Sequence, residues 1–178
     1  KVTGQYGDKT ELIPHIMREF DKLPDGTVLI GELCWRDITK TSKDVGTILR
    51  CKPAKAIERQ KTEKLVFRVF DCLAYKGEQY ECKPYHERFN MLLWIIKNLD
   101  YIYEEGEYIL NPIYTFNNFA DFLQEILSRD GEGIVIHSKS YLYAPGKRPA
   151  WTTLKVKKIT TELELPIVGF IEPNKSYE

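Results

Sequence analysis

Two neighbouring segments decide how this chain folds: GEGIVIH at residues 131–137 and WTTLKVKK at residues 151–158. Both have the length and the content of β-branched residues that strands favour, so we predict two strands here. Side chains two positions apart on a strand share a face, which places Lys155 and Lys157 together. Two ammonium groups this close repel each other unless an anion lies between them, and phosphate is the natural candidate.

Glu132 is the only acid between residues 131 and 158. It lies between Gly131 and Gly133, which let backbone or ligand approach closely, and its carboxylate could hold a hard cation such as magnesium through bound waters. The alternative is a β-turn over residues 129–132 that leads into the strand. Likewise, a solvated basic strand explains the lysines without any ligand. The residues alone leave these alternatives open.

The bulk composition restricts the kind of protein. A chain of 178 residues can bury one sizeable core, or one domain and the edge of another. Its 26 basic and 26 acidic residues cancel, so an anion site must be local. We find no cleavable signal and no apolar run of membrane length, which favours a cytosolic type of compartment. The cysteines lack metal-ligand spacing, so we expect buried, reduced thiols at Cys34, Cys51, Cys72 and Cys82.

Apolar periodicity predicts the remaining elements. It indicates helices over residues 11–20, 44–50, 86–99 and 119–128, and strands over residues 27–33, 64–75 and 108–114. Thr10 and either Asn117 or Asn118 are the expected helix caps. Several strands follow one another across short turns, without the regular alternation of a parallel doubly wound sheet. We therefore predict an α+β fold of mostly antiparallel sheets with helices packed outside.

Two residues within the predicted strands, Glu32 and Phe70, matter for the argument below. Glu32 is a carboxylate in the apolar strand 27–33, where it is costly unless it meets a cation, a metal or a hydroxyl. It equally fits an edge strand from which the side chain faces water. Phe70, in the strand 64–75, would ordinarily be a core residue.

The order of the motifs along the chain is more informative than any one of them. From the N-terminus they are GEL (31–33), FRVFD (67–71), ER (87–88), EGIV (132–135) and WTTLKVK (151–157). This ordered set resembles the covalent nucleotidyltransferase superfamily, and most closely the adenylation domain of ATP-dependent DNA ligases. The resemblance implies an ATP-grasp-like nucleotidyltransferase domain of the DNA ligase type. It also implies an N-terminally truncated adenylation domain over residues 1–160, followed by a linker and the first strand of a truncated OB-fold domain over residues 161–178.

The resemblance further implies a role for each matching residue on the side of the nucleoside. Glu32 resembles the glutamate that contacts the ribose of the nucleotide. Phe70 resembles the aromatic residue that stacks on adenine, which the face of a π-system does well. Arg88 is similar to the arginine of the helix between these motifs, and we expect it among the nucleotide-binding residues.

On the phosphate side, Glu132 is similar to the glutamate that acts near the metal, and Lys155 and Lys157 are similar to the paired lysines on the α-phosphate. These three are the expected catalytic residues, and all three are also expected to bind the nucleotide. The implied cofactors are ATP, held as AMP in the adenylate, and Mg²⁺, with Glu132 as the metal ligand. In the implied reaction a lysine attacks the α-phosphorus of ATP and pyrophosphate leaves. The AMP then passes from the lysine to the 5′-phosphate of nicked DNA, and a 3′-hydroxyl finally displaces AMP.

Two departures from the family pattern are visible. The nucleophilic lysine of the family lies in a Lys-x-Asp-Gly motif, and the 178 residues contain no such motif, so we assign no nucleophile. The strand after Glu132 usually closes with a lysine, whereas this chain has His137. A histidine is neutral over much of the physiological pH range, which predicts a weaker or different contact there.

The implied partners are ATP and nicked double-stranded DNA, in DNA replication, repair or recombination. We expect a monomer without membrane association, in the cytoplasm of a bacterium or phage-infected cell, or in the nucleus of a eukaryote. Two alternatives stay open. An RNA ligase or an mRNA-capping guanylyltransferase shares these motifs, and a non-catalytic nucleic-acid-binding module would use only the basic patch.

Overall fold

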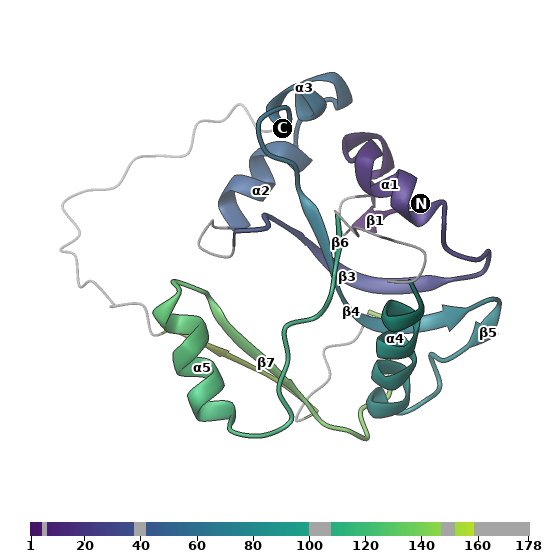
Figure 1. The fold of residues 1–178 in the computed structure, drawn as a ribbon, viewed down its shortest axis with the longest axis vertical. Coiled ribbons are helices and arrows are strands. Elements are labelled where there is room, and N and C mark those ends of the chain that lie inside the picture. Colours follow the sequence, from purple (N-terminus) through teal and green to yellow (C-terminus); the bar gives the residue numbers. More distant parts are fainter. Residues whose placement is uncertain (5–6, 38–41, 100–107, 147–151, 159–178) are drawn as a thin grey trace, which may run out of the picture.

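The computed structural model describes residues 1–178 apart from 5–6, 38–41, 100–107, 147–151 and 159–178 (Figure 1). The first elements are β1 (Thr3–Gly4), β2 (Gly7–Asp8), the 3-10 helix η1 (Thr10–Leu12), α1 (Pro14–Phe20), β3 (Val28–Cys34), α2 (Ser42–Leu49) and α3 (Pro53–Arg59). The later elements are β4 (Val66–Tyr75), β5 (Glu78–Gln79), α4 (Tyr85–Leu99), β6 (Ile109–Leu110), α5 (Phe119–Ser128), β7 (Gly133–His137) and β8 (Thr153–Lys157). Among the described helices, none combines the length and the apolar character that crossing a membrane requires.

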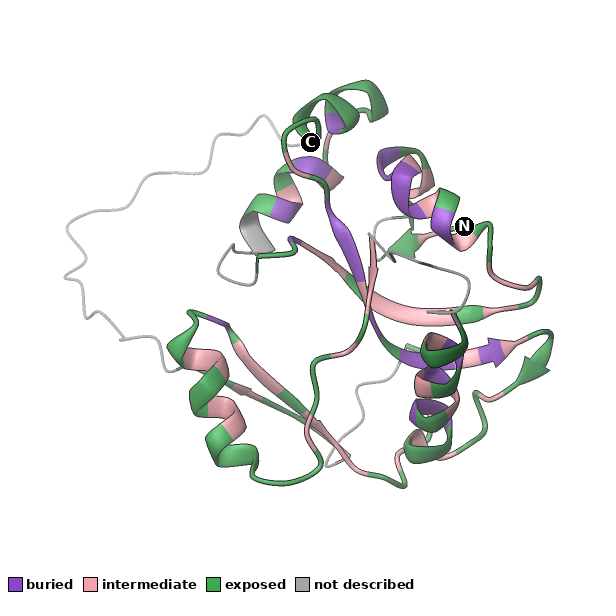
Figure 2. Ribbon diagram, viewed as in Figure 1, coloured by how far each residue is buried: buried purple, intermediate pink, exposed green. Residues whose placement is uncertain are grey.

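The larger sheet is built around β4. β3 and β5 pair with β4 in antiparallel orientation, and the short β6 adds to it in parallel. Most β4 side chains are buried, as their apolar sequence predicts, and Figure 2 shows the buried residues running along β4 and recurring on α1 and α4. Removing this apolar surface from water is what holds the sheet and its helices together.

β7 and β8 form a separate two-stranded antiparallel sheet, and α5 lies beside it (Figure 1). α5 turns Phe122, Leu123, Ile126 and Leu127 away from water, and these residues recur at the spacing of one helical face. Both strands predicted from residues 131–158 are therefore confirmed. The α+β class with mostly antiparallel sheets is confirmed as well.

The first predicted helix was placed too early. A 3-10 turn occupies residues 10–12, and α1 begins only at Pro14, whose missing N–H and fixed φ suit the first position of a helix. Thr10 is not the cap of α1. Its hydroxyl instead accepts a hydrogen bond from the backbone N–H of Val2 at 3.1 Å.

Three further expectations are corrected. The predicted strand 108–114 is reduced to β6, because Pro112 cannot donate to a sheet and interrupts it. The α3 helix was not predicted within its polar surroundings, although Pro53 marks its first turn. Asn118 does precede α5, but it has a left-handed φ of 52° and makes no side-chain capping bond.

The cysteines are free, as expected. Cys72 is buried, and this burial raises the pKa of its thiol to about 11. Cys34 and Cys51 are half-buried. The expectation of burial is wrong for Cys82, which is exposed in the polar turn after β5.

A buried ion pair joins the larger sheet to α4. Arg88 is 0% exposed and Asp71, on β4, is 4% exposed. The guanidinium donates to both carboxylate oxygens of Asp71, at 2.9 Å from Nε and 2.9 Å from Nη2. Its Nη1 donates to the backbone carbonyls of Lys83, at 2.6 Å, and Tyr141, at 3.2 Å. One side chain thus connects β4, the start of α4 and the segment that follows β7.

We predict that breaking this ion pair destabilises the fold strongly. Arg88→Met should lower the free energy of unfolding by about 3–5 kcal/mol, because it leaves the Asp71 carboxylate buried without its partner. The measurement is urea denaturation followed by circular dichroism.

Two comparisons make the result specific to burial. The double variant Arg88→Met/Asp71→Leu should recover part of the loss, since no unpaired charge remains. Arg129→Met removes an exposed ion pair with Glu125, of 2.8 Å, and should cost less than about 1 kcal/mol. Equal losses for Arg88→Met and Arg129→Met would contradict the role given to the buried pair.

Candidate functional site

The β7–β8 pair sets the positions of the two predicted phosphate-binding lysines. Lys155 lies opposite Val135 and Lys157 opposite Gly133 in the antiparallel register. Both lysines are exposed, and their spacing of two residues puts them on one face of the pair. The predicted shared face of Lys155 and Lys157 follows directly from this register.

Glu132 lies next to these lysines. Its carboxylate accepts a bond from Nζ of Lys157 at 3.3 Å, and its backbone carbonyl accepts one from the N–H of Lys158 at 3.1 Å. The side chains of Glu132 and Lys157 are 61% and 62% exposed, so their attraction is weakened by water and contributes little to stability. Such a pair is free to rearrange around a charged ligand.

Gly133 allows the two strands to approach closely. Its φ is +142°, and a Cβ at this position would collide with the backbone of Val156 and Lys157. Only glycine accepts this conformation and this proximity. The second glycine of the Gly-Glu-Gly motif is therefore needed to bring Glu132 and Lys157 together.

Glu32 and Phe70 lie on the other sheet, on the neighbouring strands β3 and β4. Glu32 is exposed and stands directly opposite Arg68, so the two side chains project from one face of the sheet. Arg68 also donates to the carbonyl of Asn111 at 2.9 Å. The exposure of Glu32 on β3, which pairs with β4 alone among the described strands, fits the edge-strand explanation, and Arg68 also places a cation opposite this carboxylate.

Phe70 is presented by a β-bulge. Val69 pairs with Gly31 and Asp71 pairs with Ile30, so Phe70 has no partner residue on β3. A bulge turns its residue away from the regular alternation of the strand. Phe70 is accordingly 38% exposed, although it belongs to an otherwise buried or half-buried strand, so the ordinary explanation of a core residue does not apply, and its predicted stacking on adenine stays a prediction.

Tyr85, the first residue of α4, joins the two sheets. Its hydroxyl donates to the carbonyl of Phe70 at 3.1 Å. Its ring lies 4.4 Å from the ring of His137 on β7, measured between centroids. The His137 ring in turn stacks on Tyr141 at 5.9 Å.

The predicted site residues therefore fall into two exposed groups, one on each sheet, and Arg88 is buried in the interior. Glu32 and Phe70 lie on β3 and β4, whereas Glu132 and the lysines lie around β7 and β8. Arg88 is fully buried and bonded to Asp71, so its structural role is clear, and its predicted contact with a nucleotide stays a prediction.

His137 stands where the family pattern has a lysine. Its Nδ1 and the hydroxyl of Thr153 on β8 are 3.0 Å apart. Burial lowers the pKa of His137 below its ordinary value, and the charge of Arg88 acts in the same direction, whereas that of Asp71 opposes it. The imidazole is therefore neutral at physiological pH and acts by packing and hydrogen bonding.

Glu132 is the residue predicted to hold a metal ion. Within the described part of the chain, no three His, Cys, Asp or Glu residues are grouped so as to hold a metal ion. Mg²⁺ commonly binds through one or two carboxylates, several waters and the phosphates of a substrate. The exposed carboxylate of Glu132, beside two lysines on which a phosphate could lie, fits that kind of site.

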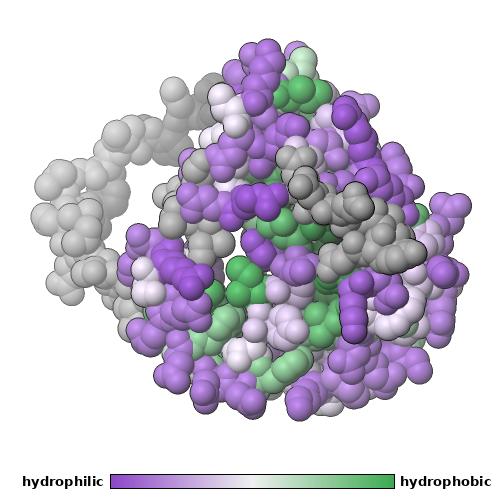
Figure 3. Space-filling model, viewed as in Figure 1, coloured by the Kyte–Doolittle hydropathy of each residue, from purple (hydrophilic) through white to green (hydrophobic). Residues whose placement is uncertain are grey.

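On the face of the molecule shown in Figure 3, hydrophobic side chains lie towards the centre and hydrophilic side chains lie around the rim.

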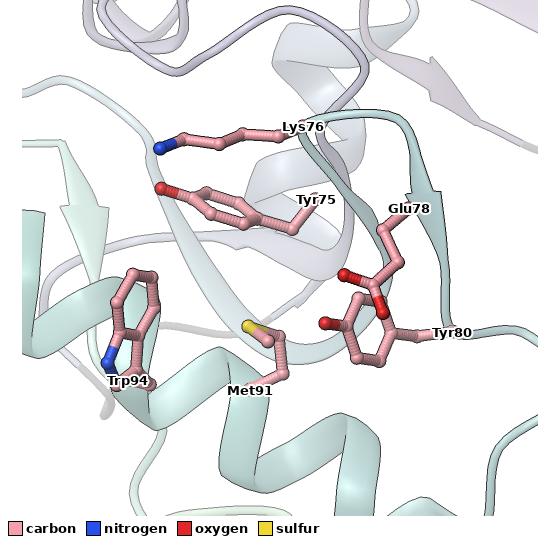
Figure 4. A pocket seen from close by; sticks show the side chains of 6 residues that line it. All are labelled: Tyr75, Lys76, Glu78, Tyr80, Met91 and Trp94. Carbon is pink, nitrogen blue, oxygen red and sulfur yellow. The ribbon is translucent and has the colours of Figure 1, made fainter.

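A cavity of about 330 Å³ lies where the turn between β4 and β5 meets α4, and it contains none of the predicted site residues (Figure 4). Its lining residues are Tyr75, Lys76, Glu78, Tyr80, Met91 and Trp94. This hollow is separate from the candidate site.

Sequence reasoning did not single out Asp71, Tyr85 or Tyr141. Asp71 had one available signal, because a carboxylate at the centre of an apolar strand requires a cation. The other two are ordinary aromatic residues in the sequence, and only their contacts reveal them. The sequence therefore identified the exposed side chains of the candidate site better than those that hold them in place.

Comparison with known proteins gives concordant results. The profile of the ATP dependent DNA ligase domain matches residues 1–157. A DNA ligase of Acidianus ambivalens is 23% identical over 170 residues, which cover 88% of this chain and 25% of that protein. Among solved structures, the ligase domain of LigD from M. tuberculosis matches with a TM-score of 0.64 and 19% identity, over 87% of this chain and 46% of that one.

The fold is thus that of a DNA ligase nucleotidyltransferase domain, as the motif order predicted. The chain belongs to the ATP-dependent DNA ligase domain family. It spans less than half of the length of each of the two relatives. Residues 161–178, predicted to begin an OB-fold domain, lie outside the described residues, and the boundary at residue 160 stays a prediction.

The low pKa of His137 predicts how stability depends on pH. The unfolded imidazole titrates near its ordinary pKa of 6.5, and the folded one titrates lower. Below pH 6.5 the unfolded chain therefore binds more protons than the folded chain. This contribution to stability is complete above the unfolded pKa and is lost as the pH falls through the folded pKa.

Thermal unfolding between about pH 7.5 and about pH 5.5 measures the effect. The unmodified chain should lose more stability over this range than His137→Phe, which keeps a ring against Tyr85 without titrating. Identical slopes for the unmodified chain and His137→Phe would disprove the assignment.

Proposed function

We propose that this chain is the nucleotide-binding part of the adenylation domain of an ATP-dependent DNA ligase. Phe70 stacks on adenine, Glu32 contacts the ribose, and the strand pair β7–β8 receives the phosphates. The observation that carries the proposal is the β7–β8 register, which puts Lys155 and Lys157 on one exposed face with Glu132 beside them.

The charges suit a phosphate ligand. An α-phosphate between Lys155 and Lys157 relieves the repulsion of their ammonium groups and accepts hydrogen bonds from both. The Glu132 carboxylate lies 3.3 Å from Nζ of Lys157 and is 61% exposed, so it is accessible to a cation beside that phosphate. Glu132 would hold Mg²⁺ at this place, and the ion would supply neutralisation of the charge on the phosphate oxygens.

The contribution of the chain to the reaction is alignment and charge stabilisation. In phosphoryl transfer the attacking and leaving oxygen or nitrogen atoms lie roughly in line, and negative charge spreads over the non-bridging oxygens. Lys155 and Lys157 stabilise that charge, while Phe70 fixes the base and thereby the position of the α-phosphorus. The attacking lysine of the Lys-x-Asp-Gly motif is not among these 178 residues.

For the whole enzyme, we propose transfer of AMP to the 5′-phosphate of nicked double-stranded DNA, followed by sealing of the nick. We propose that it acts as a monomer, in the cytoplasm or, in a eukaryote, in the nucleus. The family membership supports a DNA ligase over an RNA ligase or a guanylyltransferase.

Nucleotide binding to the chain tests the proposal. AMP should bind with a 1:1 stoichiometry in isothermal titration calorimetry. Lys155→Met and Lys157→Met should each weaken AMP binding roughly 10- to 100-fold, because a hydrogen bond to a charged group contributes about 1.5–3 kcal/mol. Lys97→Met, at an exposed lysine of α4, is the matched control and should leave binding unchanged.

The same titrations separate the alternatives. Preference for GMP over AMP would indicate a guanylyltransferase. Binding of DNA without binding of either nucleotide would indicate a non-catalytic module and would refute the proposed site.

A further inference from the structure

We propose that Tyr85 is a positioning residue for the nucleotide: its hydroxyl fixes the bulge that presents Phe70, and its ring ties that bulge to His137 on β7. The inference rests on the proposed function, because it assumes that Phe70 stacks on the base. It adds a residue that none of the recognised motifs contains.

The first step is the hydrogen bond to the bulge. The cross-strand register passes over Phe70, so this residue is held less firmly by β3 than its neighbours are. The Tyr85 hydroxyl donates to the Phe70 carbonyl at 3.1 Å. This bond restrains the peptide group from which the Phe70 ring projects, and so it limits the orientations of the ring.

The second step is the fixation of Tyr85 itself. Its ring contacts Phe89 at 5.6 Å and His137 at 4.4 Å, between centroids, and the Arg88 guanidinium carbon lies 5.5 Å from the ring centroid. Arg88 is anchored in turn by Asp71. A ring held by several fixed neighbours places its hydroxyl with little conformational freedom, as pre-organisation of a binding site requires.

The protonation state of Tyr85 agrees with a donor role. Burial raises the pKa of Tyr85 above its ordinary value, and the negative charge of Asp71 raises it further. The hydroxyl therefore keeps its proton throughout the physiological range, and the Phe70 carbonyl is an acceptor only.

The third step connects the base to the phosphate side. From Tyr85 the contacts pass to the His137 ring and then to the Thr153 hydroxyl, 3.0 Å from His137 Nδ1. Thr153 lies two residues before Lys155 on the same strand, so both side chains are on one face. A short path of contacts thus runs from the residue that stacks on the base to a residue beside the α-phosphate site.

The path gives the His137 ring a packing and hydrogen-bonding role. Burial is the main cause that disfavours a cation at this position, while the charges of Asp71 and Arg88 act in opposite directions. The neutral imidazole packs against Tyr85 and reaches Thr153. The departure from the family pattern and the presence of Tyr85 therefore belong to one arrangement.

The experiment is a double-mutant cycle read out by AMP binding to the full chain in isothermal titration calorimetry. Tyr85→Phe removes only the hydroxyl and should weaken AMP binding about three- to tenfold. In a Phe70→Leu background the same change should have almost no further effect, because Tyr85 acts through Phe70. Tyr114→Phe, which removes a hydroxyl from an exposed ring, is the matched control and should bind AMP as the unmodified chain does.

Thermal unfolding of each variant shows whether the variant is folded. A further variant, Thr153→Val, tests the contact between His137 and β8. Thr153→Val keeps a β-branched residue but breaks the bond to His137, and it should weaken AMP binding less than additively with Tyr85→Phe. Full AMP affinity in a folded Tyr85→Phe variant would overturn the inference. So would an equal loss with and without Phe70. Failure of the unmodified chain to bind AMP would instead refute the proposed function on which the inference rests.

Discussion

The ion pair between Asp71 and Arg88 is the constraint on which the rest of the structure depends. Both charges are buried, and neither is tolerable in the interior unless the other is in place. Nη1 of the Arg88 guanidinium donates to the backbone carbonyls of Lys83 and Tyr141. This requirement fixes the start of α4 against β4 and holds the segment after β7 in the same place. The buried guanidinium of Arg88 consequently positions the two sheets relative to each other, although it is not exposed at the candidate site.

Local patterns explain which parts of this fold could be predicted. The length and the β-branched residues of the two segments within 131–158 are sufficient for β7 and β8, and the 3.6-residue period is sufficient for α4 and α5, because these signals are contained within each element. Arg88 contacts Asp71 across 17 residues and Tyr141 across 53, and no local pattern encodes such distances. The start of α1 is a different case, because Pro14 is a local signal for the first position of a helix that the apparent helical period obscured.

The candidate site shows the same division. Motif order pointed to the exposed residues Glu32 and Phe70, and strand spacing predicted that Lys155 and Lys157 share a face, but the bulge at Phe70 was not predicted. Phe70 looked like a core residue because periodicity assumes a regular strand, and a bulge exists only in relation to the register of β3. The contact between Glu132 and Lys157 spans 25 residues and depends on the close approach at Gly133, which a Gly-Glu-Gly motif alone does not specify.

The separation of β7–β8 from the larger sheet has a consequence for how the molecule opens. A two-stranded sheet is marginal by itself and depends on the helix packed against it, here α5, in which no residue is fully buried. The amide hydrogens of β7 and β8 should accordingly exchange with solvent through a local opening of low free energy, while those of β4 exchange only through global unfolding. The β7–β8 sheet that carries the lysines should thus open at a lower free energy than β4, and any anion that binds the lysines stabilises that sheet first.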